Sequence, residues 1–286
     1  MNKVPLYKIG NEESQDYIEV LELQERTDYD TSKPHKHSYV EVFLFTKGGG
    51  SHEIDFVSYP IKSNSVHFVF PNQVHKVARE LDTFGHVILL SKEYFGQLDY
   101  DLFVQFFHAF YLNPAIEIPS SNFKVVLDGL TKIKEELSQQ KSYYKEIAKG
   151  SLAVLFHHFL RSNETENESG NRSSKEFKIY MDLLILIDEH FKEHQAVSFY
   201  SDALHITSRT LNSICKEFSD ATCSTLVSER IVLEAKKLLI YTDQPIKDTM
   251  YALNFNDPAY FNRFFKVKTG HTPTEFIQQF AKKYHQ

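Results

Sequence analysis

Apolar and polar residues alternate in short runs along the first third of the chain. Between about Ile18 and Leu90 turn-forming clusters separate the apolar runs, which are YIEVLEL, YVEVFLF, HEIDFVSYPI, SVHFVF and HVILL. Short runs rich in β-branched and aromatic residues, with turn signals about every 8 to 12 residues, are typical of a β-sandwich or barrel. We therefore expect residues 1–118 to form a small all-β domain.

The hydrophobic period changes to that of a helix after Pro119. Apolar residues recur at helical spacing in two stretches, at Val126, Leu130, Ile133 and Leu137, and at Ile147, Leu152, Leu155, Phe156 and Phe159. This spacing predicts two amphipathic helices within residues 119–160. Such a pair could form a dimerisation surface, or it could simply cover the barrel.

A segment without any hydrophobic residue follows, RSNETENESGNRSSK, over residues 161–175. Its Ser, Asn, Glu and Gly content predicts a flexible linker. Every segment from residue 176 to residue 286 is helical in period. The predicted fold class is therefore α+β with two domains, an N-terminal β-barrel with a helix pair and a C-terminal all-α domain.

Composition limits the classes of protein that this chain can belong to. It has 286 residues, 42% of them hydrophobic, and two cysteines. That length predicts two globular domains, and two cysteines cannot form a disulfide framework. No apolar run approaches the roughly 18 residues of a membrane helix, and the N-terminus lacks the apolar core of a secretory signal. We therefore expect a cytoplasmic protein with no membrane partner.

The net charge of −6 lies entirely in the first part of the chain. Up to Gly170 there are 17 Lys and Arg against 24 Asp and Glu, which gives −7, and the remainder has 15 against 14, which gives +1. A nearly neutral C-terminal domain can still bind DNA if its cations lie on one face, because affinity depends on local phosphate neutralisation.

Two segments of the C-terminal domain share the pattern of a short helix, a tight turn and a second helix. In the first, the turn is predicted at His205 and Ile206 and the second helix begins after Thr207, a residue type favoured as N-cap. In the second, the turn is predicted at Leu253 to Asn256, and Asp257-Pro258 is a favoured helix start. The residues expected to face outward are Arg209, Asn212, Ser213 and Lys216 in the first unit and Ala259, Asn262, Arg263 and Lys266 in the second.

The C-terminal segment from about Phe177 to Phe280 resembles the DNA-binding domain of AraC/XylS-type transcription regulators. The resemblance lies in Glu229-Arg230 with EAKKLL, in NFNDPAYFNRFFK, and in Gly270 with TPTEF. It implies that a long helix joins two helix-turn-helix units, whose second helices enter the major groove at two successive turns of DNA. Arg209, Asn212, Ser213, Ala259, Asn262 and Arg263 would then face bases, and Lys216 and Lys266 would meet phosphates.

This chain departs from that family pattern at a few positions. Asn254 stands where the second turn usually has Gly, and Asn is the best other residue for a left-handed backbone. Asp220 and Cys223 replace the usual Gly and Pro after the first unit. The family pattern therefore does not predict the shape of that connection.

Histidines and a glutamate recur at set spacing in the predicted barrel. His35, His37 and Glu41, followed by Pro71 and His75, resemble the cupin pattern and imply a small jelly roll. Alternation along one strand would turn residues 35, 37, 39, 41 and 43 into the barrel. We expect an effector pocket without metal or cofactor, and its candidate residues are His35, His37, Tyr39, Glu41, Phe43 and His75.

Three interpretations of the whole chain follow from these features. The first is a one-component, sequence-specific transcription regulator that binds duplex DNA, senses a small molecule or protein in its barrel, and forms a homodimer, with RNA polymerase as a further partner. The second is a metal-dependent cupin enzyme with a DNA-binding tail, because three histidines and a carboxylate could hold a divalent metal. The third is a DNA-bound scaffold whose barrel recruits a protein. We expect the first, without catalytic residues.

Overall fold

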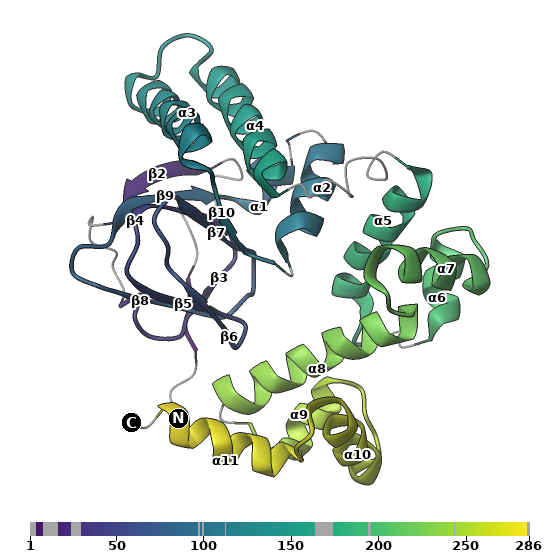
Figure 1. The fold of residues 1–286 in the computed structure, drawn as a ribbon. Coiled ribbons are helices and arrows are strands. Elements are labelled where there is room, and N and C mark those ends of the chain that lie inside the picture. Colours follow the sequence, from purple (N-terminus) through teal and green to yellow (C-terminus); the bar gives the residue numbers. More distant parts are fainter. Residues whose placement is uncertain are drawn as a thin grey trace. The chain divides into compact units, whose positions relative to one another are not determined.

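A computed structural model describes residues 4–7, 17–23, 30–96, 98, 100–111, 113–163, 174–193, 196–242 and 244–284. The chain divides into two compact units (Figure 1), one of Pro5–Ser169 and one of Met1–Val4 with Gly170–Gln286. Most of the predicted linker, residues 164–173, lies outside the described residues. Among the described residues no helix is both long and apolar enough to cross a membrane.

The first unit is built on two antiparallel sheets. Strands β2 (Ile18–Glu22), β4 (Val40–Lys47), β7 (Ser65–Val69), β9 (Phe84–Leu90) and β10 (Ala115–Glu117) form one sheet in the order β10-β7-β4-β9-β2. Strands β5 (Gly50–Ile54), β6 (Val57–Pro60) and β8 (His75–Arg79) form the other in the order β6-β5-β8, and β1 (Leu6–Tyr7) pairs with β3 (Lys36–His37). The predicted β-rich domain is confirmed.

The alternation along β4 separates two hydrophobic cores. Val40, Val42 and Leu44 belong to the core on the helix side of the larger sheet. Phe43 and Phe45 belong to a second core, to which β8 contributes Val77 and β5 contributes Ile54. Residues with odd numbers along β4 therefore face the interior between the sheets.

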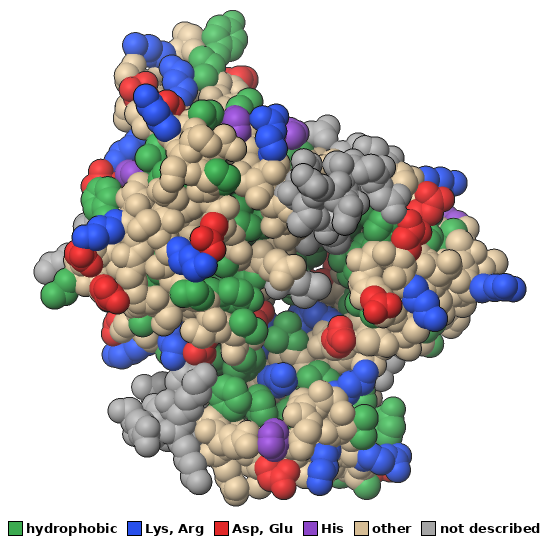
Figure 2. Space-filling view, in the orientation of Figure 1, with side chains coloured by type: hydrophobic (Ala, Val, Ile, Leu, Met, Phe, Trp, Pro, Cys, Tyr) green, Lys and Arg blue, Asp and Glu red, His purple; other side chains and the backbone are tan. Residues whose placement is uncertain are grey.

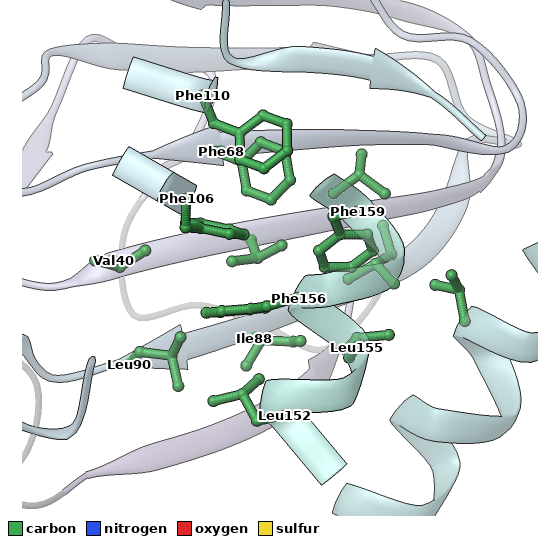
Figure 3. Close-up of a cluster of buried hydrophobic side chains, with 14 of the residues drawn as sticks. Val40, Phe68, Ile88, Leu90, Phe106, Phe110, Leu152, Leu155, Phe156 and Phe159 are labelled. Carbon is green, nitrogen blue, oxygen red and sulfur yellow. The ribbon is translucent and has the colours of Figure 1, made fainter. Parts of the chain in front are cut away.

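Four helices cover the outer face of the larger sheet: α1 (Lys92–Gly96), α2 (Tyr100–Tyr111), α3 (Ser120–Gln139) and α4 (Tyr144–Asn163). Aromatic rings join α2 and α4 to the sheet (Figure 3), since Phe106 stacks on Phe156 and Phe68 on Phe110, each at 4.1 Å between centroids. The predicted helix pair thus packs on the barrel. Ile147, expected in the buried stripe, is instead 40% exposed.

The second unit is helical throughout its described residues. Its elements are α5 (Lys175–His190), α6 (Val197–Ala203), α7 (Ser208–Ser219), α8 (Cys223–Tyr241), α9 (Ile246–Ala252), α10 (Pro258–Thr269) and α11 (Pro273–Tyr284). The two predicted helix-turn-helix units are α6 with α7 and α9 with α10, and α8 lies between them in the chain (Figure 1).

Local signals in the sequence account for the ends of these helices. The Thr207 side chain accepts a hydrogen bond from the Thr210 N–H, and Asp257 accepts from the N–H groups of Ala259 and Tyr260. Asn254 adopts φ +61° in the second turn, and Asp220 adopts φ +52° at the end of α7. Asn and Asp are the side chains that best tolerate this left-handed conformation in place of Gly, so both departures from the family pattern keep the turn.

Candidate DNA-binding helices and effector site

The outward face of α7 carries most of the residues predicted for the first unit. Arg209, Ser213 and Lys216 are exposed, whereas Leu211, Ile214 and Cys215 are buried on the opposite side. The helix therefore presents two cations and a hydroxyl. Groups of this kind can bind phosphates and base edges.

Asn212 is half-buried and lies differently from its neighbours on α7. Its Nδ2 donates to the Ser208 carbonyl at 3.0 Å, and its Oδ1 accepts from the Cys223 N–H at 3.0 Å. Cys223 is the first residue of α8. The amide of Asn212 therefore ties the N-terminal half of α7 to the start of α8, so the prediction that it faces a base is not supported by its contacts.

The predicted residues of the second unit, Ala259, Asn262, Arg263 and Lys266, are all exposed on α10. Asn262 Nδ2 donates to the Pro258 carbonyl at 2.8 Å. Arg263 lies 5.8 Å from the ring centroid of Tyr260, which is 47% exposed and which sequence reasoning missed. Figure 2 shows Lys and Arg side chains on the α9–α11 part of this unit. This surface can attract a polyanion.

Helix α8 contacts both α7 and α10. Its 19 residues span about 28 Å at 1.5 Å per residue. Arg230 holds α8 against α5, because it pairs with Asp188 of α5 at 2.7 Å and lies 4.0 Å from the ring centroid of Phe191, which directly follows α5; it also pairs with Glu234 within α8 at 3.0 Å. The two helix-turn-helix units are thus joined by one continuous helix.

Three of the residues predicted for the barrel pocket converge inside it. His37 Nε2 lies 3.1 Å from His75 Nε2, and Glu41 Oε2 lies 3.2 Å from the first and 3.5 Å from the second. All three residues are buried. Glu41 Oε2 has no hydrogen-bond donor among the described residues other than these two imidazoles.

The other ring nitrogens of both histidines have partners of their own. His37 Nδ1 lies 2.7 Å from the Tyr39 carbonyl, which can only accept, so this nitrogen donates. His75 Nδ1 lies 3.1 Å from His52 Nε2, and His52 Nδ1 lies 3.3 Å from His67 Nδ1. Neither His52 nor His67 was predicted from the sequence to belong to this site. Strand pairing between β4, β5, β7 and β8 brings them to it, and no local pattern indicates that pairing.

Burial favours the neutral form of His52, His67 and His75. It lowers the pKa of His67 from 6.5 to about 4. It also holds the pKa values of His52 and His75 well below the usual range, with repulsion from neighbouring imidazoles adding to the shift. A neutral imidazole keeps a lone pair on one nitrogen and can therefore act as a metal ligand.

The predicted strand through His35 and Glu41 is interrupted, which changes the predicted pocket. Ser38 and Tyr39 lie between β3 and β4, and His35 makes only an isolated bridge with His75. The His35 ring packs against the His75 ring at 4.1 Å, outside the group of three converging ligand atoms. The prediction that residues 35 to 43 share one strand is therefore wrong.

A cavity lies beside this cluster, within the first unit. Its volume, as the space open to the centre of a water-sized molecule, is about 50 Å³, and its lining residues are Leu21, Glu22, Leu23, Thr31, Glu41, Phe43, Val77, Arg79, Val87 and Leu89. Of the predicted pocket residues, Glu41 and Phe43 line it, and His35, His37, Tyr39 and His75 do not. The lining combines an apolar body with Glu41 and Arg79, which suits a small, partly polar ligand.

Two family models match this chain, one in each unit. An AraC-like ligand binding domain matches residues 19–104, and a helix-turn-helix domain matches residues 200–279. The chain belongs to the AraC family of transcription regulators. It is accordingly a DNA-binding regulator with an effector-sensing domain, and the expected cupin-like barrel is consistent with the first match.

Relatives of this regulator extend over nearly its whole length. The transcriptional activator RhaR of Escherichia coli is 22% identical over 262 residues, which cover 90% of this chain and 91% of RhaR. The activator RhaS of an Enterobacter species is 21% identical and covers 85% of this chain and 87% of RhaS. Among solved structures, ToxT of Vibrio cholerae with bound unsaturated fatty acid is 14% identical, covers 94% of this chain and 97% of ToxT, and has a TM-score of 0.39.

Proposed function

We propose that this regulator binds duplex DNA with α7 in one major groove and α10 in the next. The observation that carries the proposal is the pair of helix-turn-helix units with exposed second helices, joined by α8. The span of α8, about 28 Å, is close to the roughly 34 Å that separates successive major grooves on one face of DNA.

The exposed residues of the two helices divide into two chemical groups. Arg209, Ser213, Asn262 and Arg263 carry hydrogen-bonding groups for base edges, and Ala259 can contact a thymine methyl group. Lys216 and Lys266 are point charges suited to phosphates. The Tyr260 ring lies next to the Arg263 guanidinium and can hold it in position. Asn212 is assigned a structural role instead.

We propose further that the barrel senses an effector in the cavity beside Glu41 and Phe43, without catalysis. The homodimer would form through the exposed apolar residues of α3 and α4, which include Val125, Ile147 and Val154. RNA polymerase is a further partner expected of a regulator that acts at promoters. The regulator would act in the cytoplasm. The proposed domains are residues 1–118, the helix pair 119–160, the linker 161–175, and the DNA-binding domain 176–286.

Selection of bound fragments from a random DNA pool tests the DNA-binding mode. The full chain is expected to enrich a motif with two blocks whose centres lie about 10 base pairs apart, at a fixed and stated salt concentration. Enrichment of one block only, by protein shown to be folded, would mean that a single unit reads DNA.

Two substitutions on α10 then separate base contacts from phosphate contacts. Arg263→Ala should weaken binding by about 1–3 kcal/mol and relax the preference at one position, whereas Lys266→Ala should weaken all sequences alike and reduce the salt slope by about 1. Lys145→Ala, which removes an exposed charge from α4, is the control and should change neither. Equal effects of Arg263→Ala on all sequences would contradict its assignment as a base contact.

A further inference from the structure

We infer that the barrel binds a divalent first-row transition-metal ion through His37 Nε2, His75 Nε2 and Glu41 Oε2, and that this ion is the effector. The inference rests on the proposed sensing function and names the ligand class of the barrel. It replaces the expectation of a metal-free pocket. Two imidazoles and a carboxylate form a donor set that such ions favour.

The three ligand atoms have the spacing that one ion requires. Their separations of 3.1, 3.2 and 3.5 Å define a triangle whose corners lie about 1.9 Å from its centre. Bonds from zinc to imidazole nitrogen and carboxylate oxygen are about 2.0–2.2 Å long. An ion less than about 1 Å above the plane of the triangle therefore reaches all three atoms without movement of the backbone.

The hydrogen bonds around the triangle orient both imidazoles as ligands. The Tyr39 carbonyl fixes the proton of His37 on Nδ1, which leaves the Nε2 lone pair directed at His75 and Glu41. His75 can donate Nδ1–H to His52 Nε2 in the same way. Metal-bound histidines in proteins nearly always donate their second ring N–H to such a partner. His52, backed by His67, thus supplies the outer contact for His75.

When both imidazoles carry their proton on Nδ1, as metal ligands do, electron-rich atoms face one another; without an ion, His75 can instead carry its proton on Nε2 and donate it to Glu41 or His37. With both Nδ1 atoms protonated, two imidazole lone pairs and a carboxylate oxygen face one another within 3.5 Å in a buried site. A cation at the centre would compensate all three, because buried charges need a partner. Glu41 also lines the cavity, so the cavity offers a route by which an ion and a further ligand could reach the triangle.

Metal titration of the full chain tests the inference without any measurement of DNA. After removal of metal with a chelator, Zn²⁺ is titrated in competition with a chromophoric chelator, and Co²⁺ is followed by its absorption spectrum. The expected result is one ion per chain. Glu41→Gln and His75→Gln should each weaken binding by more than the about 10–100-fold typical of losing an outer partner. His157→Gln removes an exposed histidine from α4 and should bind as the unchanged chain does.

Substitutions of His52 distinguish a coordinated ion from adventitious binding. The Gln side chain places an acceptor near the position of His Nε2, so His52→Gln should keep the affinity, whereas His52→Leu should lower it about 10–100-fold. Circular dichroism and thermal unfolding of the metal-free forms establish that each variant is folded. No saturable binding, or equal binding by the unchanged chain and folded Glu41→Gln, would overturn the metal site.

A second arm tests whether the ion is the effector. Affinity for the selected DNA motif is measured with and without saturating Zn²⁺ in the unchanged chain and in Glu41→Gln. A change in affinity that Glu41→Gln abolishes supports the effector role. Metal binding with unchanged DNA affinity would overturn that role and leave the site in place. Failure to select a DNA motif would count against the proposed DNA-binding mode, and the titration would still report on the metal site.

Discussion

Asn212 and Asn262 occupy the same position of α7 and α10. The structure predicts that Asn212→Ala lowers the stability of the second unit, whereas Asn262→Ala changes its preference for bases. Both are the fifth residue of their helix, after Ser208 and Pro258. The Asn212 amide bonds to Ser208 and to the Cys223 N–H at the start of α8. The Asn262 side chain is exposed and bonds only to Pro258 among the described residues.

The magnitudes follow from these contacts. Asn212→Ala removes two hydrogen bonds, each worth about 1 kcal/mol, and leaves the N–H of the buried Cys223 without its acceptor. We expect a loss of about 2–3 kcal/mol in the free energy of unfolding. Asn262→Ala removes one exposed bond and introduces a better helix former, so its effect on stability should stay within about 0.5 kcal/mol.

Urea unfolding of the full chain and fluorescence anisotropy with a labelled duplex separate the two roles. Asn212→Ala should lower the urea midpoint of the second unit while the folded protein keeps the base preferences of the unchanged chain. Asn262→Ala should keep the midpoint and lose preference at one base position. The reasoning is refuted if Asn212→Ala unfolds like the unchanged chain and alters which bases are selected.

Two further predictions concern the first unit. Phe156→Ala should lower the free energy of unfolding of this unit by about 3–5 kcal/mol, because Phe156 is fully buried against Phe106. Val154→Ala, on the exposed side of α4, should change it by less than about 0.5 kcal/mol. Comparable shifts of the two variants in urea unfolding would contradict this prediction. His67 has a lower pKa folded, about 4, than unfolded, 6.5, so the unfolded chain binds more protons between these values. The contribution of His67 to the free energy of unfolding should therefore be fully present above about pH 6.5 and decrease as the pH is lowered. Between pH 7 and pH 5 this decrease should be on the order of 2 kcal/mol from His67 alone. Thermal unfolding of the metal-free chain should show this slope and His67→Gln a shallower one; identical slopes would be the contrary result.

Features set by neighbouring residues could be predicted from the sequence. Thr207 and Asp257 start helices because their side chains reach N–H groups two or three residues later. Asn254 was expected to tolerate a left-handed turn, and it does so at φ +61°. The alternation in β4 and the buried side of α7 follow in the same way from the two periods of secondary structure.

Features set by distant residues were missed. The run HEIDFVSYPI is a hairpin of β5 and β6, turned by Asp55 and Phe56, both with positive φ, where no Gly signals a turn. Helices α1 and α2 were not predicted, because residues 91–118 were assigned to the β domain as a whole; the Phe residues of α2 pack against the sheet, α1 and α4. The hydrogen bond between His52 and His75 and the one from Cys223 N–H to Asn212 Oδ1 join residues 23 and 11 positions apart and have no local signal.

The continuous helix α8 also limits how this regulator can evolve. Because each residue of an α-helix turns the chain by about 100° and advances it 1.5 Å, a single insertion in α8 would rotate α10 to another side relative to α7. Substitutions on the exposed faces can alter which bases are read one position at a time. The length of α8 fixes the distance between the two blocks of a target site, so a new promoter can be recognised only if its two blocks have that spacing.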